Sequence, residues 1–288
     1  DHRDLHYPLR RQRQMCIRDR DYVGFTFFIG SMAMLAATVF FFLEMGNVQG
    51  KWKTSILISG LICFIAAVHY FYMRDYWAQN AESPTFFRYV DWILTVPLMC
   101  VEFYLILKAF GAKMDLLWKM IAYSVWMLVF GYLGETAFRD QSAIWGAVST
   151  LGYIGIFYEV WFGSAKKLSQ GSNDPILQKA FNTLAWFIFA GWAIYPFGYM
   201  TIDGGLLSGV LPGESLDIIY NIGDAINKIG FGLVIYSLAV SSSGEVATEV
   251  VVIVAVVVVA VEVVAVVVVV VVVIVVCLLY TSPSPRDR

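Results

Sequence analysis

Seven stretches of about 20 mostly apolar residues follow one another along this chain, and they constrain its fold more than any other feature, because a helix of that length and composition crosses a bilayer. They span roughly 22–43, 53–73, 86–107, 117–137, 142–163, 178–200 and 216–240. Short connectors rich in Gly, Ser, Pro and charge separate them. The sequence therefore predicts an all-α integral membrane protein, a compact bundle of seven transmembrane helices.

The composition agrees with a membrane location and excludes other classes. The chain is 59% hydrophobic and only 15% charged, whereas a soluble domain is about 25% charged. A net charge of −2 argues against nucleic-acid binding. The four cysteines have no metal-ligand spacing, so no metal site is expected.

Basic residues alternate between the connectors and predict an orientation, since basic loops stay in the cytoplasm. The odd connectors hold most of the lysines: Lys51, Lys53, Lys108, Lys113, Lys119, Lys166, Lys167 and Lys179. The sixth connector has no Lys or Arg and carries Asp203, Glu214 and Asp217. We therefore expect the first span to start outside and the seventh to end in the cytoplasm.

Both ends of the chain differ from the part between them. Residues 1–20 are basic and have no apolar core, so they do not form a signal peptide. Residues 241–288 are a valine-rich, low-complexity tail, and both 16–20 and 284–288 finish in RDR. We interpret both ends as read-through or adapter sequence, with a genuine low-complexity anchor as the alternative for the tail. This leaves 21–240 as the folded domain.

Ionisable residues are few within the seven stretches, and each is costly at membrane depth, by roughly 2.5 to 3.5 kcal/mol on insertion scales. The main ones are His69, Arg88, Asp91, Glu102, Glu135, Glu159, Asp224 and Lys228. Such residues usually face the bundle interior, pair with one another and mark ion or proton pathways. Glu159 could instead face the lipid headgroups.

The third stretch places two carboxylates on one stripe of a helix. Arg88, Asp91 and Thr95 share a face because they are three and four residues apart. Glu102 follows Asp91 by eleven residues, which puts it about 16 Å further along the axis and nearly in line. A carboxylate near the membrane centre and another toward the cytoplasm suit stepwise proton transfer.

Asp224 and Lys228 lie four residues apart in the seventh stretch and therefore share a helix face. One interpretation is an ion pair that merely lowers the cost of insertion. The other is a lysine that forms a Schiff base with a carbonyl ligand. A protonated Schiff base would need counterions, for which Asp91 and Asp224 are candidates.

Three separated motifs, RYVDWILTVPLMCVEFYLIL, GWAIYPFGY and IYNIGDAINKIGFG, resemble the proteorhodopsins, bacterial light-driven proton pumps that bind retinal. DYVGFTFF, KWKTSILISG, HYFYMRDYW and LVFGYLGE match the same family in unbroken order. The resemblance covers residues 21–240 and implies a seven-helix retinal-binding domain. It implies a transporter in the bacterial inner membrane and no enzyme.

The resemblance implies roles for the charged residues. Lys228 corresponds to the lysine that binds all-trans retinal as a Schiff base, Asp91 to the primary proton acceptor and counterion, and Asp224 to the second counterion. Glu102 corresponds to the cytoplasmic proton donor, and Asp91, Thr95 and Glu102 together match the pattern of outward proton pumps.

Other positions match the family's supporting residues. His69 corresponds to the histidine that pairs with the acceptor, Arg88 to the arginine below the counterions, and Glu135 to a family glutamate of uncertain role. Met99 occupies the colour-tuning position, where methionine resembles the green-absorbing branch. The positions that line retinal in the family are occupied here by Trp92, Trp192, Tyr195, Pro196, Tyr199 and Tyr220.

The expected function is therefore light-driven outward proton pumping, with the lipid bilayer and protons as partners and a homo-oligomer, a pentamer or hexamer, as the assembly. One alternative is a sensory rhodopsin that signals to a transducer, although a sensor has no need for a fast donor such as Glu102. The other is a seven-helix receptor or transporter without a chromophore, in which Asp224 and Lys228 are only an ion pair.

Overall fold

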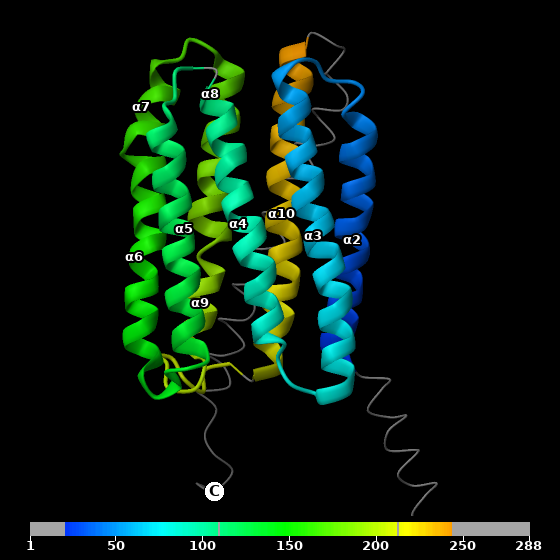
Figure 1. The fold of residues 1–288 in the computed structure, drawn as a ribbon, viewed down its shortest axis with the longest axis vertical. Helices are drawn as coiled ribbons and strands as arrows, with labels where there is room; N and C mark the ends of the chain where they lie inside the picture. Colours follow the sequence, from blue (N-terminus) through cyan, green and yellow to red (C-terminus); the bar gives the residue numbers. More distant parts are fainter. Residues whose placement is uncertain (1–20, 109, 212, 244–288) are drawn as a thin grey trace, which may run out of the picture.

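The computed structural model describes residues 21–108, 110–211 and 213–243, and seven helices within them are long and apolar enough to cross a membrane. These helices stand side by side as one up-and-down bundle (Figure 1). The predicted fold class is confirmed. The predicted leader, 1–20, and residues 244–288 of the predicted tail lie outside the described residues.

The first five spans are continuous helices, each packed on the next. They are α2 (Tyr22–Glu44), α3 (Lys51–Asn80), α4 (Thr85–Lys108), α5 (Met114–Glu135) and α6 (Ser142–Trp161), with the short 3₁₀ turn η1 (Arg139–Gln141) before α6. Helix α3 continues seven residues beyond the predicted 53–73 and ends where Ala81 adopts a left-handed φ of 53°. Pro84 directly precedes α4, where a proline costs no helical hydrogen bond.

The connector predicted between the fifth and sixth spans is partly helical. Its SAKKLSQG segment forms α7 (Ser164–Gly171). The Glu159 carboxylate accepts a hydrogen bond of 2.9 Å from the Ser164 N–H, one of the amides that lack a partner at the start of α7. Lys119 Nζ lies 3.5 Å from the same carboxylate. Glu159 is buried within the bundle, which contradicts the alternative that it faces the headgroups.

The sixth span is one helix interrupted in its middle. It consists of α8 (Pro175–Trp186), the π-helical turn η2 (Phe187–Gly191) and α9 (Ile194–Thr201). Pro175 occupies the first turn of α8, and the Asp174 side chain accepts hydrogen bonds from the Ile176 and Leu177 N–H groups, at 2.9 and 3.2 Å. The predicted span 178–200 is confirmed, and the interruption has no counterpart in the apolar pattern.

Helix α10 (Gly213–Ser243) carries the seventh span and packs against α2, α3 and α8. A larger share of its span is buried than of any other described span, which suits the helix that holds Lys228. The helix starts three residues before the predicted 216–240. Asp217 lies within its first turns and is buried, whereas the sequence analysis counted it among the acids of the sixth connector.

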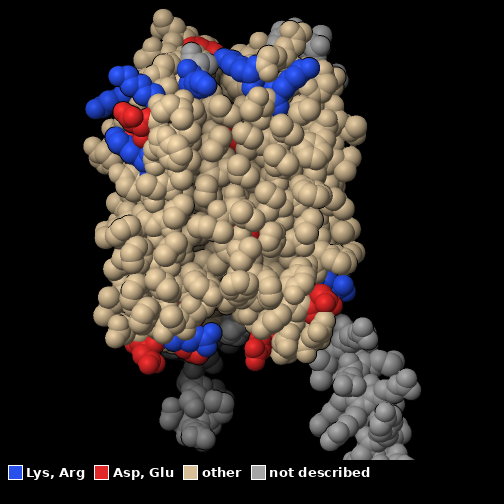
Figure 2. All heavy atoms as spheres, in the orientation of Figure 1, with Lys and Arg blue, Asp and Glu red and all other residues tan. Residues whose placement is uncertain are grey.

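Charged side chains gather at the two ends of the bundle and leave the visible side nearly bare between them (Figure 2). Lysines dominate the end that holds the α2–α3, α4–α5 and α7–α8 connections and the last turns of α10 (Figures 1 and 2). We call this the lysine-rich end. It unites the odd connectors, as the sequence predicted.

Candidate functional site

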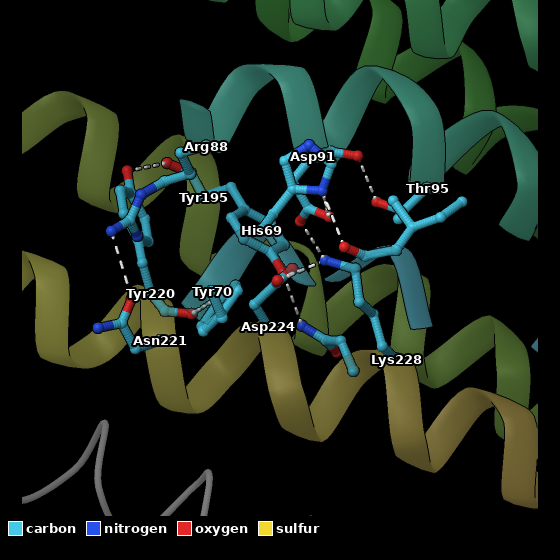
Figure 3. Close-up of polar contacts among 12 residues, drawn as sticks. His69, Tyr70, Arg88, Asp91, Thr95, Tyr195, Tyr220, Asn221, Asp224 and Lys228 are labelled. Carbon is cyan, nitrogen blue, oxygen red and sulfur yellow. Dashed lines mark hydrogen bonds and ion pairs between the residues drawn. The ribbon is translucent and has the colours of Figure 1, made fainter. Parts of the chain in front are cut away.

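The site centres on Lys228, whose amine lies between two carboxylates (Figure 3). Lys228 Nζ is 2.9 Å from Asp91 Oδ2 on α4 and also contacts Asp224 Oδ2, one turn earlier on α10. All three residues are at most 3% exposed. The predicted meeting of Asp91, Asp224 and Lys228 is confirmed. Two carboxylates thus lie beside a single amine nitrogen, an arrangement that favours positive charge on that nitrogen.

Tyr195, Thr95 and His69 surround the ion pair. The Tyr195 hydroxyl donates to Asp224 Oδ1 at 2.9 Å. The Thr95 hydroxyl donates to the backbone carbonyl of Asp91, also at 2.9 Å, and so supports this turn of α4 without touching the carboxylate. His69 Nδ1 donates to the Ile65 carbonyl at 2.8 Å and lies 3.9 Å from Asp91 Oδ1. His69 therefore faces Asp91, as predicted, but at ion-pair distance and not through a hydrogen bond.

Arg88 lies nearer the end opposite the lysines and points away from Asp91. Its Nη2 donates to Asp217 at 2.8 Å and to Asn221 at 3.2 Å. Asp217 also accepts a hydrogen bond of 2.8 Å from Ser83. Arg88 thus lies below the counterions, as predicted, but its carboxylate partner is Asp217, which the sequence analysis left in a connector. The register 217, 221, 224 and 228 on one face of α10 could have revealed it.

Replacing Asp217 by alanine should destabilise the protein by about 3 to 5 kcal/mol, because it leaves the Arg88 guanidinium buried without an anion. Both partners are no more than 5% exposed. Thermal unfolding of the protein in detergent measures the effect. Asp203→Ala is the matched control, since Asp203 is an exposed acid near the same end. Equal stability of the two variants would contradict a structural ion pair.

Glu102 lies farther along α4, toward the lysine-rich end, and is 1% exposed. Its Oε1 accepts a hydrogen bond from the Ser59 hydroxyl on α3. The Ser59 hydroxyl also approaches the Ser55 carbonyl at 3.3 Å. The predicted position of Glu102, on the stripe of Asp91 and nearer the lysines, is confirmed. Ser59 was missed, since a serine in an apolar stretch carries no signal in the sequence.

A cavity of about 320 Å³ opens beside Lys228. All the predicted retinal-lining residues reach it, namely Trp92, Met99, Trp192, Tyr195, Pro196, Tyr199 and Tyr220. Trp92 and Tyr195 are 5.0 Å apart between ring centroids and meet edge to face, which makes one wall rigid. Tyr153 and Asn227, which the sequence analysis did not consider, line the cavity as well.

These residues fit a long, flat, apolar molecule with a carbonyl at one end. The walls are mainly apolar and include several aromatic rings, and a lysine amine, the group that condenses with a carbonyl, lies among them. Asp91 Oδ1 is buried and has no hydrogen-bond partner within the described residues, so it has capacity left for a polar group at the amine. Retinal, which combines a polyene with an aldehyde, has this chemistry.

Glu135 lies outside this cluster. It is half-buried at the end of α5, and its backbone carbonyl accepts a hydrogen bond of 2.9 Å from Arg139 Nε. It does not line the cavity. Its carboxylate is hydrogen-bonded to Tyr89, which does line the cavity, so Glu135 contacts the site from behind the cavity wall.

The chain is similar to known retinal proteins. A family described as "Bacteriorhodopsin-like protein" matches residues 21–242. The green-light absorbing proteorhodopsin of Gamma-proteobacterium EBAC31A08 is 45% identical over 226 residues, 77% of this chain and 88% of that protein. The blue-light absorbing proteorhodopsin of Gamma-proteobacterium Hot 75m4 is 43% identical over 225 residues, with the same coverage.

Solved structures agree with these relatives. The blue light-absorbing proteorhodopsin from Med12 superposes with a TM-score of 0.66 at 40% identity, covering 77% of this chain and 100% of that one. Xanthorhodopsin, described as a light-driven ion pump with dual chromophore, gives 0.66 at 28% identity, covering 77% and 94%. Together with the seven-helix bundle and the lysine site, these matches show that the chain belongs to the bacteriorhodopsin-like family, as a proteorhodopsin homologue, and the family implies a retinal chromophore and light-driven pumping, not enzymatic catalysis.

Proposed function

We propose that this protein is a light-driven outward proton pump that binds all-trans retinal through Lys228. The observation that carries the proposal is the placement of two buried carboxylates on α4: Asp91 touches the Lys228 amine, and Glu102 lies farther toward the lysine-rich end. A pump needs a proton acceptor on one side of its active nitrogen and a donor on the other. Asp91 and Glu102 are candidates for these two roles.

The aromatic cavity would hold retinal, which, bound to Lys228 as a protonated Schiff base, supplies light absorption and the energy of its isomerisation. Asp91 Oδ2, at 2.9 Å from Lys228 Nζ, is placed to take the proton that this nitrogen carries. Asp224 remains as the second anion beside the nitrogen, held by the Tyr195 hydroxyl. His69 faces the Asp91 carboxylate, and Thr95 donates a hydrogen bond to the Asp91 carbonyl. The Arg88–Asp217 ion pair lies beyond Asp91, on the side away from Glu102.

Glu102 is placed to return a proton to the Lys228 nitrogen from the other side. Its buried site disfavours a free carboxylate, so it holds a proton until the nitrogen needs one. The Ser59 hydroxyl orients it through a hydrogen bond. The lysine-rich end then faces the cytoplasm by the positive-inside rule, which places the start of α2 outside and the end of α10 in the cytoplasm of a bacterial inner membrane.

Two finer proposals rest on the family. Met99 lines the cavity, and methionine at this position favours green absorption. We also propose that the protein assembles as a pentamer or hexamer, as the resemblance implies.

The light-induced pH change of an unbuffered suspension of cells tests the function. Cells that express the full chain and receive all-trans retinal should acidify the medium in light, and a protonophore should abolish the signal. Cells without added retinal are the control. A coloured protein that produces no pH change would overturn the proposal and favour the sensory alternative.

Glu102→Gln should slow the recovery of the visible band after a flash by about 10²-fold or more, since a positioned proton donor contributes about 10²- to 10⁴-fold. A glutamine keeps the shape of the side chain but has no proton to give. Flash photolysis in membranes measures the recovery. Glu82→Gln, an exposed glutamate in the α3–α4 connection, is the control. Recovery at the rate of the unmodified protein would remove Glu102 as the donor.

A further inference from the structure

The sixth span contains a π turn immediately before the cavity. The Trp192 N–H donates to the carbonyl of Phe187, five residues back, at 3.0 Å. A π turn holds one residue more than an α turn, and one residue corresponds to about 100° of rotation around a helix. Trp192, Tyr195 and Pro196 follow the turn and line the cavity. The turn therefore sets which face of α9 forms the cavity wall.

Side chains from two other helices hold this turn. The Tyr153 hydroxyl on α6 lies 3.0 Å from the Ile188 carbonyl and 2.9 Å from the Phe189 carbonyl, so its one hydrogen is shared between them. Asn227 Nδ2 on α10 donates to the Gly191 carbonyl at 3.0 Å. Three of the five carbonyls of the turn thus have side-chain partners, and both donors also line the cavity.

Gly191 and Asn227 fit each other closely. A Cβ added to Gly191 would lie 2.0 Å from Asn227 Oδ1, so only glycine leaves room for this amide. Asn227 is buried and directly precedes Lys228 in the chain. Asn227 Oδ1 has no hydrogen-bond partner in the described part of the chain. The contact thus joins the turn to the residue next to the reactive lysine.

We propose that Tyr153 and Asn227 are positioning residues that clamp the π turn and thereby fix Trp192 and Tyr195 against the cofactor cavity. The hydrogen bonds of the clamp join residues of the chain itself. The effect of the clamp on the absorption of the pigment rests on the proposed function. A π turn is a rare conformation that often occurs at functional sites. Here three carbonyls of the turn accept hydrogen bonds from two side chains that line the same cavity.

Hydrogen exchange in the retinal-free, full-length protein tests the clamp directly. Tyr153→Phe removes one hydroxyl and preserves the ring, and Asn227→Ala removes the second donor. In the double variant, amides of residues 188–192 should exchange about five- to tenfold faster, as expected for the loss of hydrogen bonds that hold a local structure closed. Gly191→Ala should produce the same change by displacing Asn227.

Tyr104→Phe is the matched control, because Tyr104 is a buried tyrosine of α4 whose hydroxyl contacts Met114 Sδ at 3.2 Å and lies outside the cavity lining. It should leave exchange at 188–192 unchanged. The retinal-loaded variants of the clamp should also absorb at a shifted wavelength, whereas Tyr104→Phe should not.

Unchanged exchange at 188–192 in the double variant would overturn the clamp. So would faster exchange combined with an absorption maximum that stays in place, because the cavity wall would not then depend on the turn. Neither hydrogen exchange nor the absorption maximum depends on proton transport. A protein that fails to acidify the medium can therefore still confirm the clamp, and a working pump can still refute it.

Discussion

Lys228→Ala should form no visible pigment when all-trans retinal is added. Lys228 is the only lysine that lines the cavity found in the described residues, so no other amine there can condense with the aldehyde. Absorbance between the near-ultraviolet and the red, recorded after retinal addition to purified protein, measures the result. A visible band in this variant would show that retinal binds elsewhere and would overturn the assignment of Lys228.

The same substitution should also lower stability, because Asp91 and Asp224 remain buried together without their cation. Breaking a buried pair by removing one partner costs about 3 to 5 kcal/mol, less where a carboxylate takes up a proton. Lys119→Ala is the matched control, since the side chain of Lys119 is 51% exposed although it also pairs with a glutamate. It should keep both the pigment and the thermal stability.

Asp91→Asn should abolish light-driven acidification and shift the visible band to the red. An asparagine at 2.9 Å from the Lys228 nitrogen cannot take up its proton. It also removes a negative charge that stabilises the cation in its ground state, so the energy needed for excitation falls. The pH change of cell suspensions and the absorption spectrum measure the two effects.

The control for Asp91→Asn is Asp75→Asn, an exposed aspartate on α3 that accepts a hydrogen bond from Gln79 at 2.7 Å. It should pump at the normal rate with an unchanged spectrum. Retained acidification by Asp91→Asn would contradict its role as acceptor. A red shift without loss of pumping would leave Asp91 as a counterion only.

The sequence predicted those parts of the site that depend on spacing within one helix. Asp224 and Lys228 are four residues apart, and helical geometry alone puts them in contact. Glu102 falls on the stripe of Asp91 for the same reason. The contact between Asp91 and Lys228 joins residues 137 apart in the chain. Helix spacing could not predict it: the need for a counterion made Asp91 a candidate, and the resemblance to the family implied the role.

The parts that the sequence did not predict depend on packing between helices. Asp217 was misplaced because a helix start in a polar connector leaves no apolar periodicity to follow. Ser59 and Tyr153 act through single hydroxyl groups, and such residues are common in membrane helices without any special contact. The π turn has no composition of its own, since FIFAG consists of apolar residues that are equally common in α-helical membrane spans.

The distance in the chain between Asp91 and Lys228 has a consequence for biosynthesis. Spans enter the membrane as they are made, and at about 5 to 20 residues per second the 137 residues between them take on the order of 10 s. During that interval each nascent chain carries Asp91 without its cation, with Arg88 one turn away as the nearest positive charge in its own helix. The last of the described helices to be synthesised supplies the amine. The visible absorbance of a culture therefore reports only those molecules whose translation and insertion are finished.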